Sequence, residues 1–301
     1  MLRTPVLFLV FNRPEQTLQV FRQIRLQQPE QLFIAADGPR QDRPGEAALC
    51  ETTRTAVLNG IDWPCEVTTL FREHNLGCGK AVSSAIDWFF GHVEEGIILE
   101  DDCVPDATFF SFCTAMLTKY RDNTTIMHIN GGNYQAGIPR GNASYYYSRY
   151  AHIWGWASWR RAWQYYDFTL QRYKRDSREG LSTFLQSELQ AIYGHRVDTW
   201  DIQWFMSVWF NKGWVITPNI SLVKNIGYGK DATHTRVVPG WFKKIRYGTI
   251  TAISHPDSYH INEEADRYTV NTLYNPGRLI LRVKKIVKNN TFLYNLYKRI
   301  S

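Results

Sequence analysis

The sequence predicts an α/β protein with a mostly parallel central sheet flanked by helices. Short β-rich apolar runs alternate with helical patterns through the first 130 residues, as in βαβ units with right-handed crossovers. Polar residues follow the predicted strands, where open α/β sheets bind their ligands. The 301 residues are enough for one large domain or two small ones, and 44% hydrophobic with 21% charged residues is a globular composition.

The elements of this first part can be placed from the spacing of their apolar residues. Strands are predicted at 6–11, 32–36, 67–71, 96–99 and 125–129. Helices are predicted at 14–25, 44–58, 80–90 and 107–120. In the first of these helices Leu18, Phe21 and Ile24 recur at helical spacing.

The pattern changes after residue 130. Eight of the eleven tryptophans fall within residues 154–214, and most of them are expected in the core. We expect the sheet to stop here and helices to follow at about 157–167, 180–193 and 200–212. We therefore divide the chain into an α/β half (1–130), a Trp-rich helical lobe of the same domain (131–275) and a basic amphipathic tail (276–301).

The net charge of +7 comes from the tail. Residues 277–301 hold seven lysines and arginines and no acidic residue, so the rest of the chain is neutral. A neutral body offers no basic groove, which disfavours nucleic acid as a partner. The apolar residues of the tail share one face of a helix, which suits either an anionic membrane surface or packing on the body.

Several classes of protein are disfavoured by what the sequence lacks. It has no run of about 18 apolar residues, no signal-peptide pattern and no P-loop or dinucleotide-binding glycine motif. Its five cysteines are an odd number without a CxxC pair, so neither a disulfide framework nor a zinc site is expected. A reducing, cytoplasmic location is predicted.

Glu100, Asp101 and Asp102 directly follow a predicted buried strand. Three adjacent carboxylates repel one another, so we expect a cation to compensate them. Oxygen ligands favour a hard cation, Mn²⁺ or Mg²⁺, shared with substrate phosphates. The alternative is an acidic helix N-terminus beside Asp106. The strand context and the polar loops after the three other strands favour the cation.

Five segments resemble N-acetylglucosaminyltransferase I, in the same order. They are Val6–Arg13, Phe33–Asp37, Ile97–Asp102, Pro105–Asp106 with Phe109–Phe110, and Trp200–Asp201 with Trp204. The chain also resembles bacterial sugar transferases labelled "hemolytic protein", through Asn12–Pro14, Asn75–Cys78, Trp154–Trp159 and His255–Asp257. The resemblance runs from about residue 5 to 270 and implies a GT-A fold, that of nucleotide-diphospho-sugar transferases. The segment between the third predicted strand and Asp102 departs from the eukaryotic enzyme, so its uridine contacts there are not carried over.

The resemblance also implies roles for individual residues. Arg13 and Asp37 would hold the uridine end of the donor, Asp101 its ribose and Glu100 its sugar. Asp102 would be the direct protein ligand of the metal, and Asp201 the catalytic base. Lys230, Thr233 and His234 fall in a segment that would close over the donor phosphates. Without the resemblance, Asp201 would be read as the cap of a surface helix.

We therefore predict a metal-dependent, inverting glycosyltransferase that uses a UDP-sugar. Its acceptor would be a glycan or lipid-linked glycan in bacterial surface-glycan assembly. The protein would work in the cytoplasm, at the surface of the inner membrane. The alternative is a non-catalytic protein that binds a sugar nucleotide or a membrane and keeps only the fold.

Overall fold

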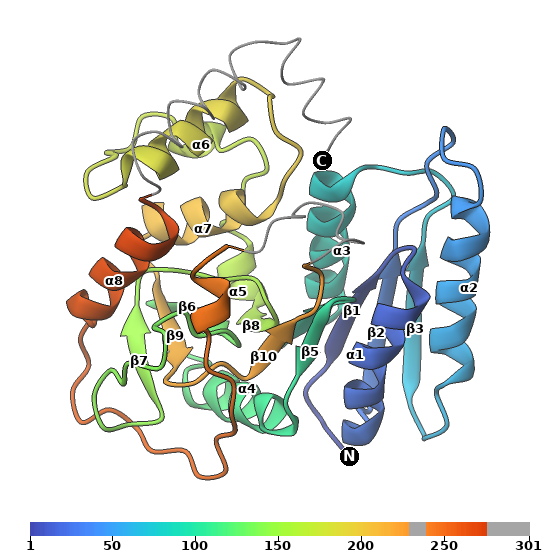
Figure 1. Cartoon of the computed structure of the whole chain (residues 1–301), viewed down its shortest axis with the longest axis horizontal. Coiled ribbons are helices and arrows are strands. Elements are labelled where there is room, and N and C mark those ends of the chain that lie inside the picture. Colours follow the sequence, from blue (N-terminus) through green and yellow to red (C-terminus); the bar gives the residue numbers. More distant parts are fainter. Residues whose placement is uncertain (229–238, 276–301) are drawn as a thin grey trace.

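Residues 1–228 and 239–275, which the computed structural model describes, form a central eight-stranded sheet flanked by helices (Figure 1). Its strands are β1 (Val6–Val10), β2 (Gln31–Ala36), β3 (Glu66–Phe71), β4 (Glu95–Glu100), β6 (Ile126–Asn130), β7 (Tyr145–Ser148), β8 (Trp156–Trp159) and β9 (Trp214–Pro218). They lie in the order β3-β2-β1-β4-β8-β6-β9-β7. Of these eight, β7 and β8 run against the other six, so the predicted mostly parallel sheet is confirmed.

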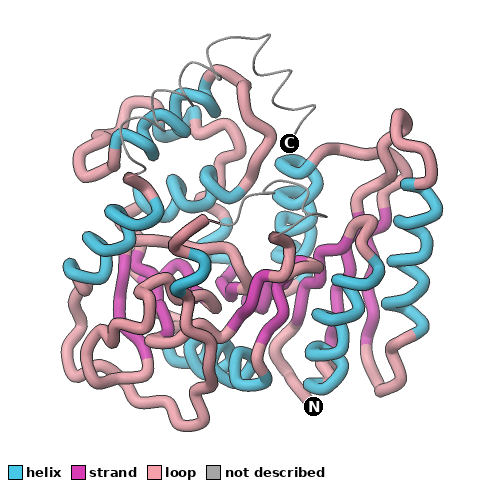
Figure 2. The backbone as a smooth tube through the Cα atoms, viewed as in Figure 1, coloured by secondary structure: helices cyan, strands magenta, loops and turns pink. Residues whose placement is uncertain are grey.

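Helices cover both faces of the sheet, and β1 illustrates why. Val6, Phe8 and Val10 point into one core, and Leu7 and Leu9 into the other, because side chains alternate along a strand. The first core is closed by α1 (Pro14–Gln27), α2 (Glu46–Asn59) and α4 (Ala107–Lys119). The second is closed by α3 (Cys78–His92), α5 (Arg160–Trp163), α6 (Thr183–Tyr193) and α7 (Asp201–Phe210). Figure 2 shows the strands crossing the middle of the molecule among these helices.

The expectation that the sheet stops at residue 130 is wrong. Strands β7, β8 and β9 come from the second half of the chain, and β8 lies between β4 and β6. The helix expected at 157–167 is correspondingly wrong, since only the four residues of α5 are helical there. Trp156 packs into one core while Ala157 and Trp159 pack into the other. A short strand buried on both faces has no polar alternation, so its apolar pattern is also compatible with a helix.

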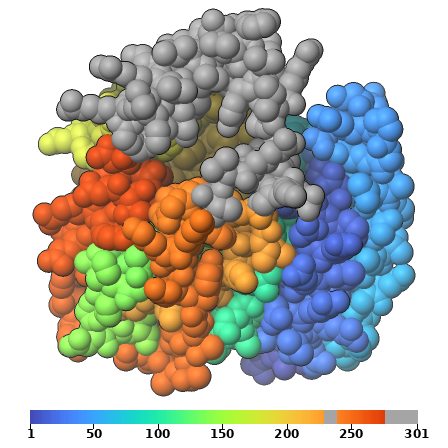
Figure 3. Space-filling model, viewed as in Figure 1, coloured from blue at the N-terminus to red at the C-terminus, as the bar shows by residue number. Residues whose placement is uncertain are grey.

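The tryptophans of the second half are mainly structural, as expected. Five of the eight are buried: Trp156, Trp159, Trp163, Trp200 and Trp204. The helices predicted at 180–193 and 200–212 are present as α6 and α7. In Figure 3 the N-terminal residues (blue) fill one side of the visible face, and C-terminal residues (orange and red) fill the other. The second half therefore lies beside the first and completes its sheet.

A small second sheet brings residues 223–225 next to the short strand that follows β4. It pairs β5 (Cys103–Pro105) with β10 (Val223–Asn225) in antiparallel register, and Cys103 lies opposite Asn225. Helix α8 (Glu263–Leu273) closes the described part of the chain. Within the described residues, no helix combines the length and apolar character needed to cross a membrane. The predicted basic tail, 276–301, lies outside the described residues.

Candidate functional site

The carboxyl ends of four neighbouring parallel strands form one edge of the sheet. Arg13 follows β1, Asp37 follows β2, the loop 75–77 follows β3, and Glu100 is the last residue of β4. Strand pairing therefore brings together polar segments that are up to about 90 residues apart in the sequence.

Arg13 pairs with two of the three carboxylates that follow β4. Its guanidinium forms an ion pair with Asp101 and a second one, at 3.2 Å, with Asp102. Asp101 is only 4% exposed, and its Oδ2 has no hydrogen-bond partner among the described residues. Arg13 therefore supplies part of the positive charge that was expected beside the acidic triplet. To bind the uridine end, as the resemblance implies, Arg13 would have to contact the nucleoside while it keeps these two ion pairs.

Glu100 has the least favourable electrostatic surroundings of the triplet. Desolvation raises its pKa well above the usual range, and the charges of Asp102, Asp101 and Asp201 raise it further. Arg13 opposes this shift without cancelling it. Glu100 therefore lies in a concentration of negative charge that a bound cation would relieve.

Asp102 is held by the small second sheet. Asn225 donates from Nδ2 to Oδ1 of Asp102 at 3.2 Å, and the amide of Ile226 donates to the Asp102 carbonyl at 2.8 Å. A side chain at Gly227 would collide with the Asp102 carboxylate. Asp106, not the triplet, caps α4 by accepting from the amide of Thr108 at 2.8 Å. The triplet itself is separated from α4 by β5, so it does not form the acidic N-terminus of that helix.

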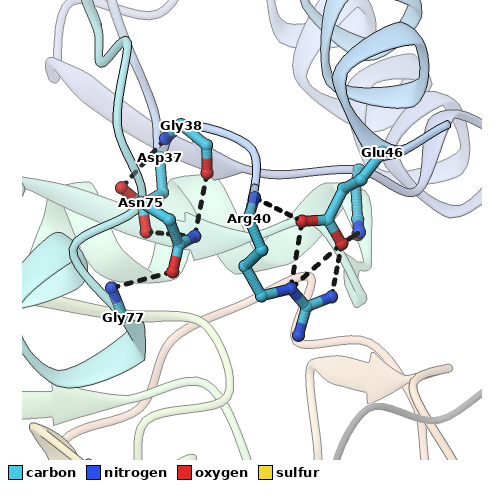
Figure 4. A network of polar contacts seen from close by, with 7 residues as sticks. Asp37, Gly38, Arg40, Glu46, Asn75 and Gly77 are labelled. Atoms are coloured by element: carbon cyan, nitrogen blue, oxygen red, sulfur yellow. Dashed lines mark hydrogen bonds and ion pairs between the residues drawn. The ribbon is translucent and has the colours of Figure 1, made fainter. Parts of the chain in front are cut away.

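Asp37 binds the loop that follows β3 (Figure 4). Its carboxylate accepts hydrogen bonds from the amide of Leu76 at 3.0 Å and from Nδ2 of Asn75 at 2.9 Å. The amide of Gly38 adds a third donor at 2.9 Å. Desolvation raises the pKa of Asp37, although these amides act in the opposite direction. In this structure Asp37 thus shapes the loop of the predicted donor site.

Asp198 links the second half of the chain to the N-terminus of α3. Its Oδ1 accepts from the Gly79 amide at 2.9 Å. A Cβ at Gly77 or at Gly79 would lie 2.6 Å from a carboxylate oxygen of Asp198. Gly77 also has a φ of +79°, which favours glycine. The Gly77–Gly79 segment is therefore shaped to receive a carboxylate from the loop before α7.

Asp201 is the first residue of α7 and faces the triplet. Thr199 donates a hydrogen bond from its hydroxyl to Oδ1 of Asp201, and Gln203 donates to the carbonyl of Thr199 at 2.7 Å. The charge of Asp201 contributes to the raised pKa of Glu100, which places the two carboxylates within electrostatic reach. Asp201 is thus both a helix-terminal residue and a member of the acidic edge.

Asp201 also lines a pocket of about 260 Å³. Its walls are mainly aromatic and include Tyr134, Trp154, Phe205, Trp241 and Tyr274. Trp154 also contacts Tyr228, with ring centroids 5.6 Å apart. Desolvation raises the pKa of Tyr228, and the charge of Asp102 raises it further. The pocket and the acidic edge are therefore neighbours, and Asp201 lies at their boundary.

The residues predicted as a site fall into two groups. Arg13, Asp101 and Asp102 contact one another, and Glu100 and Asp201 complete the same acidic edge. Lys230, Thr233 and His234 lie outside the described residues. Sequence reasoning missed Asp198 and Asn225, whose partners are more than 100 residues away. The only signal in the sequence for this contact was the Gly77–Gly79 pair, which lies far from Asp198 along the chain.

Comparisons with known proteins give no family. No family description matches the chain, and no curated protein does. Among solved structures, a cytidylyltransferase from Leptospira borgpetersenii serovar Hardjo-bovis (strain JB197) aligns with a TM-score of 0.34 and 11% identity. The alignment covers 55% of this chain, which spans 63% of the length of that protein.

A second solved structure, a UDP-glucose pyrophosphorylase complexed with UDP-glucose, aligns with a TM-score of 0.37 and 9% identity. Here the alignment covers 72% of this chain and 90% of the other. Likeness at this level assigns neither a family nor a reaction. The function therefore has to be argued from the residues of the site.

Proposed function

We propose that the chain is an inverting glycosyltransferase that moves a sugar from a nucleoside diphosphate, UDP, to a hydroxyl group. The observation that carries this proposal is that Asp201 lines the aromatic pocket while its charge acts on Glu100 at the acidic strand ends. A donor diphosphate with its cation would lie at the acidic edge, and an acceptor in the pocket. Asp201 would then be within reach of both.

The reaction needs one base and one stabilised leaving group. Asp201 accepts the proton of the acceptor hydroxyl while that oxygen forms a bond to the anomeric carbon of the donor sugar. The bond between the anomeric carbon and the phosphate oxygen breaks, and the diphosphate leaves with its electron pair. Arg13, Asp37 and Asp101 are proposed to bind the nucleoside, and Glu100 the donor sugar.

We propose a hard divalent cation, Mn²⁺ or Mg²⁺, that depends on the donor for most of its ligands, because the described residues hold no cluster of three or more His, Cys, Asp or Glu side chains that could bind a metal ion. Asp102 is partly exposed and would be its one protein ligand, with diphosphate oxygens completing the shell. Oδ2 of the buried Asp101 has no hydrogen-bond partner among the described residues, although Arg13 pairs with Oδ1 of the same carboxylate. Such a cation supplies charge stabilisation for the departing diphosphate. Lys230, Thr233 and His234 are proposed to donate to the same phosphates.

One observation favours the second candidate, a non-catalytic protein that binds a sugar nucleotide. Arg13 already pairs with Asp101 and Asp102, so part of the charge of the triplet is compensated within the protein. A binding protein would need no metal and would release no sugar. The two candidates therefore differ in metal dependence and in turnover.

A thermal-shift screen with UDP-, GDP- and CDP-sugars, with Mn²⁺ and with EDTA, tests the proposal. We expect a UDP-sugar with Mn²⁺ to stabilise the chain, by about 2.7 kcal/mol at a concentration of 100 Kd. Asp102→Asn should weaken Mn²⁺-dependent binding tenfold or more, which is about 1.4 kcal/mol. Asp106→Asn is the matched control, because asparagine also caps helices. Equal donor affinity in Mn²⁺ and in EDTA would contradict the metal assignment.

A further inference from the structure

The aromatic pocket beside Asp201 has a fixed wall made of two indoles. Trp154 and Trp241 lie 5.8 Å apart between ring centroids, with their planes inclined by 31°. Tyr134 is buried and meets both of them edge-on, at 5.3 Å and 5.5 Å. Both indoles are only half-buried, and they line the pocket together with Tyr134.

A second aromatic surface belongs to the same pocket. Phe205 of α7 and Tyr274 lie 5.9 Å apart with an inclination of 29°, close to a stacked arrangement. The pocket is therefore lined by flat apolar surfaces from two separate parts of the chain. Flat aromatic surfaces suit a ligand that presents C–H groups over a broad face.

The polar groups of the pocket disfavour an anionic ligand. His152 also lines it, and desolvation, followed by the neighbouring His128, lowers the pKa of His152 to about 3. His152 is therefore uncharged near neutral pH, which leaves Asp201 as the charged side chain among the described lining residues. A carboxylate can accept a hydrogen bond from a hydroxyl group of the ligand.

The rings of the pocket form two groups, and a cationic ligand is the main competitor of a neutral one. Aromatic cages bind an ammonium group by surrounding it with ring faces. Here Tyr134, Trp154 and Trp241 pack against one another, and Phe205 with Tyr274 forms the second group, so competition by choline tests whether the rings enclose an ammonium group. At about 260 Å³ the pocket lies near the lower end of small-molecule sites, roughly 300–1,000 Å³, so it suits a group the size of one sugar ring.

We propose that this pocket is the acceptor subsite and binds one neutral pyranose unit of the acceptor. The face of the sugar ring packs on Trp154 and Trp241, and one hydroxyl donates a hydrogen bond to Asp201. This inference rests on the proposed function, because Asp201 there takes the proton of that hydroxyl as its oxygen attacks the donor. It adds that the acceptor is recognised through a ring and not through a lipid chain or a charged group.

Saturation-transfer NMR with methyl glycosides of glucose, galactose and N-acetylglucosamine tests the proposal on the full chain. We expect at least one glycoside to bind, with the strongest saturation on its ring C–H protons. Trp241→Ala should weaken that binding by roughly fivefold to tenfold, and Trp241→Phe, which keeps an aromatic face, by less. The control is Trp88→Ala, because Trp88 is a half-buried residue of α3 that packs on Phe33 and His92.

The outcomes separate this inference from the proposed function. The subsite is contradicted if no glycoside binds, if Trp241→Ala binds as tightly as the unmodified chain, or if choline displaces the glycoside. Donor binding is followed in parallel by thermal shift and should be unchanged in Trp241→Ala. If glycosides bind as expected while no nucleotide sugar does, the proposed transferase fails and the pyranose site stands. If the donor binds and glycosides do not, the subsite alone is wrong.

Discussion

Each carboxylate at the sheet edge has a different set of partners, and its chemistry follows from that set. Asp101 is buried against Arg13, Asp102 is shared between Arg13 and Asn225, and Glu100 meets mainly other acids. Asp201 is held by Thr199 at a helix terminus and borders the pocket. Of these four, Asp201 is the best placed to take a proton from a ligand in the pocket.

Asp201→Asn keeps the shape of the side chain and its hydrogen bond from Thr199 but removes the proton acceptor. We expect turnover to fall by about 10²–10⁴-fold while donor affinity stays within a factor of two or so. Steady-state transfer assays and donor titrations measure the two quantities. A parallel loss of turnover and donor affinity would instead make Asp201 a binding or folding residue.

Asp266 of α8 provides a pH prediction. Desolvation raises its pKa to about 6, although Ser148 and the Arg149 amide donate to it at 2.6 Å and 3.1 Å. Between pH 4 and 6 the folded chain then binds the proton that the unfolded chain has released, so stability falls as pH rises through this window. A shift from about 3.8 to about 6 corresponds to at most about 3 kcal/mol.

Asp266→Asn removes this titration and keeps an acceptor for the Arg149 amide. We expect the variant to lose the Asp266 contribution to the fall in stability between pH 4 and 6, and to be as stable as the unmodified chain or more so at pH 7. Urea unfolding at a series of pH values measures the difference between the two chains. A difference that does not change with pH would contradict the assigned titration.

At the level of residues, the types of chemical group at the site were predictable from the sequence, but their contacts with one another were not. The acidic triplet could be recognised because it follows an apolar strand, and its repulsion implied a compensating cation. The identity of Arg13 as one such cation could not, because Arg13 and the triplet are brought together only by the pairing of β1 with β4. Asp198 was missed for the same reason, since it contacts a glycine 119 positions away.

At the level of elements, α3 and the loop before α7 depend on each other. Asp198 accepts from the Gly79 amide and supplies negative charge to the N-terminus of a fifteen-residue helix. The same loop continues through Thr199 to Asp201. The anchor of α3 is therefore also part of the support of the proposed base.

Asp198→Ala should lower the free energy of unfolding by about 1 kcal/mol, as expected when a helix loses its N-terminal acceptor. Asp198→Asn keeps an acceptor oxygen and should retain most of that stability. Asp176→Ala, in an exposed loop, is the control and should have little effect. Chemical denaturation of the variants measures these differences. Equal stability of Asp198→Ala and the unmodified chain would show that the contact does not support α3.

The elements of the first 130 residues were predictable because apolar strands alternate with amphipathic helices. The strands of the second half were not. Residues 156–159 are buried on both faces, and their one polar residue, Ser158, is itself buried, so no alternation of exposed polar residues marks the strand. Their position between β4 and β6 depends on how the whole sheet pairs and not on the sequence of the segment itself.

At the level of the whole molecule, the net positive charge comes from residues 277–301. If this tail binds an anionic membrane, a chain ending at Asn275 should fold and bind the donor but lose affinity for anionic vesicles. Each Lys or Arg near such a surface contributes about 1 kcal/mol, and binding should weaken as salt is raised. Vesicle co-sedimentation and thermal melts of both chains measure this. A lower melting temperature with unchanged vesicle binding would favour a tail that packs on the body.

The position of β8 between β4 and β6 has a consequence for the order in which the chain is made. During synthesis β4 emerges about 60 residues before the strand that pairs with its free side. At 5–20 residues per second, the interval is roughly 3–12 seconds. During that time the nascent chain presents an unpaired, apolar strand edge, which is a template for pairing with other chains. Chaperones that bind nascent chains would therefore be needed most between the synthesis of residues 100 and 160.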